Sequence, residues 1–239
     1  MKPHLPNAKK ETGEPRRDND LAAELRGFGP VGIISIIIII LSGNITFGII
    51  VIPVGAVLVL VWVRFAHMPW DVIGYGRPKS WPVTIALGVI FGVAFKFLMK
   101  VIVMPLLGAP AENQAYHYLA GNNALLPFAI LAMLNAGFSE ETVFRGYIFE
   151  RLGKLIGHGG VQKLFILLFT SLWFGFDHYT VQGMAGAEQA FIAGLVYGCI
   201  FYATGKIWLV MFAHAAFDLT SLTIIFFSLE DKFAHLIFK

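Results

Sequence analysis

Long apolar runs, interrupted by short polar segments, occupy most of the chain. They predict an all-α fold, a polytopic membrane helix bundle with about seven transmembrane helices. The expected spans cover residues 29–41, 45–63, 82–104, 124–149, 164–176, 189–203 and 207–227. Because a helix needs about 20 residues to cross the apolar core of a bilayer, the first run is short. We interpret the first two runs as a tight helical hairpin, and one long re-entrant element is the alternative.

The polar segments divide the chain into four parts. Residues 1–27 contain six Lys and Arg and five Asp and Glu, so they predict a flexible cytoplasmic tail and not a signal peptide. The hairpin and the third span form an N-terminal membrane unit over residues 28–106, and a second helix bundle covers 124–227. Residues 228–239 are expected to form an amphipathic tail. Aromatic and basic residues alternate over 64–81, which favours a segment at the membrane surface.

The distribution of basic residues predicts the orientation, because Lys and Arg concentrate in cytoplasmic loops. With a cytoplasmic N-terminus, three further cytoplasmic segments contain three, three and one Lys or Arg, namely 64–81, 151–163 and 205–206. The opposite loops, 107–123 and 179–188, contain none. Lys96 and Lys100 run against this pattern unless they snorkel or line a cavity. We therefore expect an integral, multi-pass membrane protein whose N-terminus is cytoplasmic.

Composition agrees with this fold class. The chain is 57% hydrophobic and only 14% charged, whereas soluble domains carry about 25% charged residues. The net charge of +3 is explained by basic cytoplasmic loops, and no stretch is typical of a nucleic-acid-binding module or of a phosphate-binding loop. The single cysteine, Cys199, lies in an apolar run and excludes both a disulfide framework and a cysteine metal site. We expect the lipid bilayer as a partner and no nucleic acid.

Three charged residues interrupt the apolar run at 124–149: Glu140, Glu141 and Arg145. An ionisable side chain inside a bilayer costs several kcal/mol unless it is paired or faces water, so it is a functional candidate by default. Glu141 and Arg145 share a helix face, with the acid N-terminal to the base, which favours an ion pair. Glu140 points about 100° away and is free to act as a general base on water. An ion pair that only locks the bundle is the alternative, and it leaves Glu140 without a partner.

Two later pairs have the spacing of neighbours on one helix face, Phe174 with His178 and His214 with Asp218. The second pair can hold a metal ion or bind an oxyanion. A hydrogen-bonded structural pair and the proton relay of a transporter are the alternatives. The expected boundaries put His178 and Glu140 at depths that differ by about 10 Å. Either the fifth span begins later than residue 164 or it is tilted.

The ordered set of Glu-Glu-x-x-x-Arg, Phe-x-x-x-His and His-x-x-x-Asp on successive apolar runs resembles the CPBP family. These are the type II CAAX prenyl endopeptidases and bacteriocin-processing proteins, also called the Abi family. The resemblance covers residues 124–227 and makes them the catalytic helix bundle. It implies an intramembrane endopeptidase, a hydrolase of the metalloprotease type. Its substrate would be a prenylated CAAX-type protein or a bacteriocin-like peptide.

The resemblance also implies roles for individual residues. Glu140 would activate the water, and His178 would assist it or bind a metal. His214 and Asp218 would stabilise the oxyanion or complete the metal site. Supporting positions would be held by Glu141, Arg145 and Phe174. The implied cofactor is a divalent metal, Zn²⁺, and a metal-free glutamate mechanism is the alternative; the metal ligands would be Glu140, His178, His214 and Asp218.

One residue departs from the eukaryotic members of the family, which have asparagine where this chain has Asp218. An amide can donate a hydrogen bond to an oxyanion and an ionised carboxylate cannot, so aspartate favours a metal ligand or a residue that orients His214. With the small size and short loops, it also favours a bacterial plasma membrane. A non-catalytic scaffold or immunity protein and a small proton-coupled transporter are the alternative functions. The natural substrate and the oligomeric state are left open.

Overall fold

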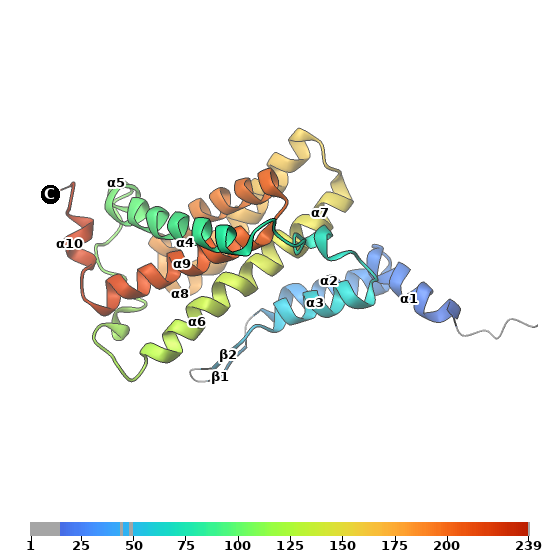
Figure 1. Ribbon diagram of the computed structural model, residues 1–239, viewed down its shortest axis with the longest axis horizontal. Coiled ribbons are helices and arrows are strands. Elements are labelled where there is room, and N and C mark those ends of the chain that lie inside the picture. Colours follow the sequence, from blue (N-terminus) through green and yellow to red (C-terminus); the bar gives the residue numbers. More distant parts are fainter. Residues whose placement is uncertain (1–14, 44, 48–49, 239) are drawn as a thin grey trace, which may run out of the picture.

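The computed structural model describes residues 15–43, 45–47 and 50–238, and it is a bundle of helices (Figure 1). The helices of the described residues are α1 Pro15–Arg26, α2 Pro30–Ser42, α3 Val54–Phe65, α4 Trp81–Leu98, α5 Met104–Leu106, α6 Leu126–Glu141, α7 Phe149–Ile156, α8 Gly160–Thr204, α9 Ile207–Phe226 and α10 Glu230–Ala234. Two strands, β1 Ile45–Phe47 and β2 Ile50–Ile52, pair antiparallel. The predicted helical membrane bundle is confirmed.

The number of spans differs from the predicted seven. By length and composition, the described residues contain three helices that could cross a membrane: Trp81–Leu106, Gly160–Thr204 and Ile207–Phe226. The fifth and sixth predicted spans both lie in α8, whose backbone breaks at Gly183 with φ 65° and ψ −163°. A positive φ is accessible to glycine at no steric cost, so this residue lets the chain turn back. The count of seven is not confirmed, whereas the membrane-type bundle is.

The predicted N-terminal hairpin forms, but its connection is a pair of strands. The apolar run 45–63 was expected to be one helix; its first part instead contains β1 and β2, and α3 begins only at Val54. Isoleucine and valine favour extended backbone, and Pro53 suits the position just before a helix. The helix expected over the whole run is therefore wrong for its first residues.

The polar N-terminal segment is also more ordered than predicted. Residues 1–14 lie outside the described residues, but 15–26 form α1. The Arg26 guanidinium donates to the Ala66 carbonyl at 2.7 Å, and the Trp62 indole donates to the Leu25 carbonyl at 3.0 Å. These bonds tie the end of α1 to α3, so a flexible tail is the wrong description of this part.

Helix α9 is the most buried of the three candidate spans, with 56% of its apolar window inside the protein against 33% for the other two. Glycines allow its neighbours to approach closely. A Cβ atom at Gly92 of α4 would lie 2.1 Å from the Ala213 carbonyl oxygen, and one at Gly137 of α6 would lie 2.6 Å from the Ala215 nitrogen. Small residues are typical of such helix contacts in membranes. The contacts bring α4 and α6 against the part of α9 that carries His214.

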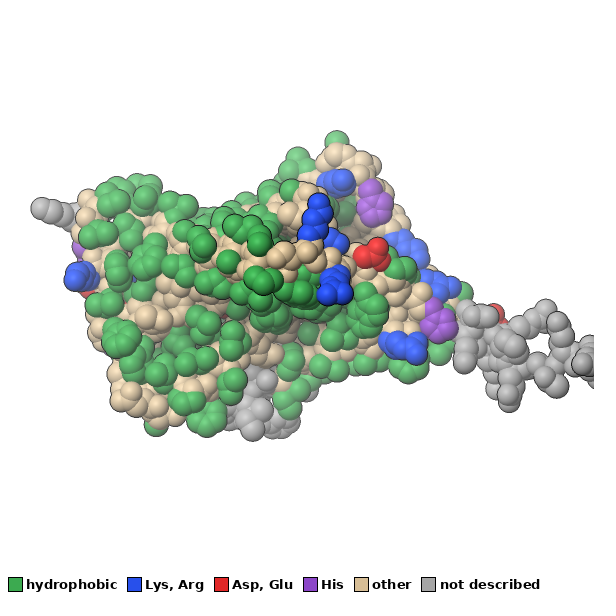
Figure 2. Space-filling model, viewed as in Figure 1, with side chains coloured by type: hydrophobic (Ala, Val, Ile, Leu, Met, Phe, Trp, Pro, Cys, Tyr) green, Lys and Arg blue, Asp and Glu red, His purple; other side chains and the backbone are tan. Residues whose placement is uncertain are grey.

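The surface agrees with a membrane protein. Hydrophobic side chains cover most of the face in Figure 2, and most of the Lys and Arg visible there gather toward the end that carries α1 and α7. Among the exposed large hydrophobic residues are Ile90 and Phe91 of α4 and Leu172 and Phe176 of α8. Exposed apolar side chains on long helices are stable where lipid surrounds them.

Candidate active site

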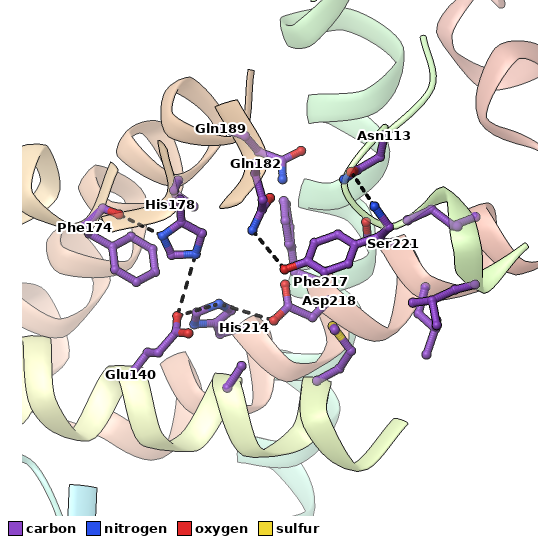
Figure 3. Close-up of a pocket in the computed structure, with 18 residues that line it drawn as sticks. Asn113, Glu140, Phe174, His178, Gln182, Gln189, His214, Phe217, Asp218 and Ser221 are labelled. Atoms are coloured by element: carbon purple, nitrogen blue, oxygen red, sulfur yellow. Dashed lines mark hydrogen bonds and ion pairs between the residues drawn. The ribbon is translucent and has the colours of Figure 1, made fainter. Parts of the chain in front are cut away.

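Four ionisable side chains from three helices converge on one cavity (Figure 3). Glu140 comes from α6, His178 from the first part of α8, and His214 and Asp218 from α9. The Glu140 Oε2 atom lies 4.0 Å from His178 Nε2 and 3.9 Å from His214 Nε2. Asp218 Oδ2 lies 3.5 Å from His214 Nε2. The structure thus brings together all four residues that the sequence analysis proposed as catalytic.

The two adjacent glutamates face different surroundings. Glu141 is completely buried, and its Oε1 atom accepts hydrogen bonds from Arg145 at 2.9 Å and from His214 Nδ1 at 2.7 Å. Arg145 also donates to the Gly194 carbonyl at 3.2 Å. Glu140 lines the cavity, and its Oε2 atom is buried without a hydrogen-bond partner among the described residues. The Glu141 carboxylate is therefore held by protein donors at Oε1, although its Oε2 atom is also buried without a partner among the described residues. Glu140 is the glutamate that faces the cavity and is available to a ligand.

The backbone after these glutamates is not a regular α-helix. Residues Thr142–Ile148 form a π-helical stretch that joins α6 to α7. Such wider turns are rare and occur frequently at functional sites. Arg145 lies inside this stretch, so its position on the face of Glu141 depends on local backbone geometry as well as on spacing.

Hydrogen bonds orient both imidazole rings. A carboxylate and a carbonyl can only accept, so the Nδ1 atom that contacts each of them carries a proton. His214 Nδ1 donates to Glu141, and His178 Nδ1 donates to the Phe174 carbonyl at 2.8 Å. The Phe174 ring also packs on the His178 ring, with centroids 4.5 Å apart. Both Nε2 atoms are thereby left facing Glu140.

His178 and Glu140 lie close together, so they do not differ in depth in the way that the expected span boundaries predicted. The fifth span was expected to end at residue 176, which placed His178 at a span end. In the structure α8 begins at Gly160 and continues past His178 to the break at Gly183. His178 therefore lies within a longer helix, level with Glu140.

Polar residues that the sequence analysis did not single out also line the cavity, which has a volume of about 100 Å³. They are Asn113, Tyr116, Gln182, Gln189 and Ser221. Gln182 donates to the Tyr116 hydroxyl at 3.4 Å. Burial raises the pKa of the Tyr116 hydroxyl to about 12, so the group stays protonated at neutral pH. Gln182 falls in the expected loop 179–188 and Gln189 begins the expected span 189–203, so no sequence pattern singled out these positions.

The donor set does not fit a metal ion as it stands. Imidazole nitrogens and carboxylates are suitable zinc ligands, and the ligands of a tetrahedral zinc at 2.0–2.1 Å lie about 3.3 Å apart. Glu140 Oε2 lies 3.9 and 4.0 Å from the two Nε2 atoms. In the described part of the chain, no group of three or more His, Cys, Asp and Glu side chains is placed to hold a metal. The Zn²⁺ implied by the family resemblance is untested, this donor geometry does not favour it, and no step below depends on it.

Comparison with known proteins bears directly on this site. Residues 122–220 match the family model of the type II CAAX prenyl endopeptidase Rce1-like proteins. The chain carries an Rce1-like segment. This match confirms the resemblance that the three motifs indicate, and the segment contains Glu140, His178, His214 and Asp218. No curated protein and no solved structure matches the chain.

The Rce1-like segment and the apolar helices together indicate an integral membrane protein. The segment begins just before α6 and ends within α9, so it covers the three helices that build the cavity. Helices α1 to α5 lie outside it. The loop residues Asn113 and Tyr116 are therefore contributed to the site from outside the matched segment.

Proposed function

We propose that this protein is an intramembrane endopeptidase that hydrolyses a peptide bond of a membrane-associated substrate. The single observation that supports this function best is the Glu140 carboxylate, buried at Oε2 without a protein partner and flanked by two oriented imidazoles. A substrate of the CAAX type, a prenylated peptide, follows from the family description. A bacteriocin-like peptide is the alternative substrate.

The distances around Glu140 suit one water molecule. Separations of 3.9 and 4.0 Å are too long for a hydrogen bond and are typical of polar groups bridged by water. His178 donates its only proton through Nδ1 when neutral, so Nε2 presents a lone pair toward the Glu140 carboxylate. Two facing acceptors are satisfied by a water that donates one proton to each. The oxygen of that water then has its lone pairs free to attack a carbonyl carbon.

The reaction follows from these positions. Glu140 takes a proton from the water as its oxygen attacks the peptide carbonyl, and a tetrahedral oxyanion forms. Glu140 then transfers this proton to the leaving amine, and the C–N bond breaks. In its protonated form, His214 can donate from Nε2 to the oxyanion because Glu141 and Arg145 hold the ring in place. Asp218, 3.5 Å from the same Nε2, favours that protonated form.

The orientation and the membrane are part of the proposal. We place the N-terminus in the cytoplasm, on the basis of the basic segments, and the protein in a bacterial plasma membrane. In this arrangement the active site lies within the helix bundle, and a lipid-modified peptide reaches it from the bilayer. Hydrolysis inside a helix bundle needs a cavity that water can enter. The polar residues that line this cavity suit it to hold water: Asn113, Tyr116, Gln182, Gln189 and Ser221.

Peptide cleavage by the detergent-purified protein tests this function. A farnesylated CAAX peptide and a panel of membrane-segment peptides would be incubated with wild type and with Glu140→Gln, and the products identified by mass spectrometry. We expect cleavage by the wild type and a loss of at least about 100-fold in Glu140→Gln, since general base catalysis contributes about 10²–10⁴-fold.

The matched control is Glu24→Gln, the same chemical change at an exposed position of α1. It should cleave like the wild type. Equal cleavage by wild type and folded Glu140→Gln, or no cleavage of any peptide by the wild type, would contradict the proposal.

A further inference from the structure

A buried lysine lies beside the proposed active site and forms no direct ion pair with a carboxylate of the described residues. Lys96 of α4 is only 4% exposed. Its Nζ atom donates to the Gln189 side-chain oxygen at 2.9 Å and lies 4.7 Å from the centre of the Phe217 ring. None of the ion pairs among the described residues includes it. The charge of Asp218 acts on Lys96 from beyond ion-pair distance. An ammonium group buried without a direct ion pair is costly, so a bound anion would stabilise it.

A second lysine, Lys100, lies one turn further on, in the π-helical stretch Met99–Val103 that follows α4, and it does have a carboxylate partner. Lys100 Nζ lies 3.9 Å from the carboxylate of Glu230, which is itself 3% exposed. That carboxylate also accepts the Asn113 backbone N–H at 2.8 Å. The charge of Lys100 is therefore balanced within the protein. Lys96 forms no such ion pair, so of the two lysines it is the one that is available to a ligand.

The close contact between α4 and α9 determines where Lys96 lies. A side chain at Gly92 would collide with the Ala213 carbonyl of α9. Lys96 follows Gly92 by one helical turn, and Phe217 follows Ala213 by one turn, so the lysine lies over the phenylalanine. The next residue of α9 is Asp218 of the active site. The helix packing that forms the catalytic cavity thus also places Lys96 beside that cavity.

A second cavity joins Lys96 to the catalytic residues. It has a volume of about 420 Å³, and its charged lining residues are Lys96, Lys100, Glu112 and Glu230. It shares five lining residues with the cavity of Glu140: Asn113, Gln182, Gln189, Ser221 and Ile225. This volume is within the range of about 300–1,000 Å³ that is typical of ligand pockets. Gln182 and Gln189 appear above Glu140 in Figure 3, on the side where the two cavities meet.

We infer that Lys96 binds the free C-terminal carboxylate of the peptide substrate, and that the second cavity holds the few residues that follow the cleaved bond. This inference rests on the proposed endopeptidase function. A charge-assisted bond between ammonium and carboxylate is strong in a desolvated site, and the amide side chains around it can bond to a peptide backbone. The protein would then select peptides by the distance between the cleaved bond and the chain end.

Two peptides that differ only at the C-terminus test the inference. A farnesylated CAAX peptide would be prepared as the free acid and as the C-terminal carboxamide, which has the same shape and no charge. For the wild type we expect kcat/KM to be on the order of 10- to 100-fold higher for the acid, the range of a hydrogen bond to a charged group. Lys96→Met should lose this preference by slowing cleavage of the acid and leaving that of the carboxamide unchanged.

A matched control is Lys232→Met, which removes an exposed lysine of α10 and should keep the preference for the acid. A second variant, Gln189→Glu, would put a carboxylate beside Lys96 and should also abolish the preference. The comparison of the two peptides on the wild type needs no variant, so a folding defect does not affect it.

The outcomes separate the inference from the function on which it rests. Equal cleavage of acid and carboxamide by the wild type would overturn the role of Lys96 and leave the endopeptidase function intact. An equal loss on both peptides in Lys96→Met would also overturn it, because it would show that the lysine only balances the charge of Asp218. No cleavage of either peptide by the wild type would overturn the proposed function, and the inference with it.

Discussion

Replacing Arg145 by methionine tests whether the buried ion pair beside the active site stabilises the fold. Arg145 is 2% exposed and Glu141 is completely buried, so Arg145→Met leaves a carboxylate in the protein interior with His214 as its only partner. It also leaves the Gly194 carbonyl without its donor. Methionine is chosen because it keeps most of the apolar volume that packs on Phe174.

The expected cost follows from what is left unpaired. Removing one partner of a buried ion pair destabilises proteins by about 3–5 kcal/mol, mainly because the other charge stays buried. For a chain of this size, 1 kcal/mol corresponds to about 2–4 °C in melting temperature, so we expect a decrease of roughly 6–20 °C. Thermal unfolding of the detergent-solubilised protein, followed by circular dichroism, measures it.

Two further variants make the result interpretable. Arg64→Met makes the same change at an exposed position near the end of α3, where the expected effect is within about 0.5 kcal/mol. The double variant Glu141→Gln/Arg145→Met should recover part of the lost stability, because the amide oxygen can still accept from His214 and no charge remains buried. If Arg145→Met melts within about 2 °C of Arg64→Met, the ion pair does not stabilise this protein and the reasoning is wrong.

Two other predictions address helix packing and the metal. Gly92→Ala should destabilise the protein by about 1–3 kcal/mol through collision with the Ala213 carbonyl, whereas Gly160→Ala, with nothing within 4 Å of the added carbon, should not; melting curves of both variants decide this. Because the described donors do not fit a tetrahedral ion, we expect 1,10-phenanthroline to leave peptide cleavage unchanged and elemental analysis to find less than one zinc per chain. Inhibition that added Zn²⁺ reverses would contradict this.

Local helix geometry made part of the site predictable. Residues four apart share a face of an α-helix, so the pairing of His214 with Asp218 followed from spacing alone. Spacing also predicted the pairing of Glu141 with Arg145, although the π-helical backbone at Arg145 contributes to it. The difference of about 100° between the directions of Glu140 and Glu141 followed from the helical repeat in the same way. Apolar run length likewise predicted the membrane-type bundle, and the order of the motifs predicted the Rce1-like segment at residues 122–220.

The positions at which a helix is interrupted or the chain reverses direction were less predictable from the sequence. The strands β1 and β2 lie in an isoleucine-rich run that suits a membrane helix equally well, because such residues are compatible with both structures. The reversal within α8 depends on a single glycine with positive φ. Helix α1 has a polar sequence, and its order comes from the bonds that tie its end to α3.

Only the tertiary structure decided which motifs meet and what else joins them. The hydrogen bond from His214 to Glu141 joins residues 73 positions apart, and the approach of His178 to Glu140 needs two different helices at one depth. These relations depend on how closely neighbouring helices pack, which Gly92 and Gly137 permit through contacts that no local pattern encodes. Lys96 did not fit the distribution of basic residues expected from the sequence. The same helix contacts explain its position, because they place it in the lining of the second cavity. Periodicity acts within one helix, whereas the depth and facing of separate helices are set by side chains far apart in the chain.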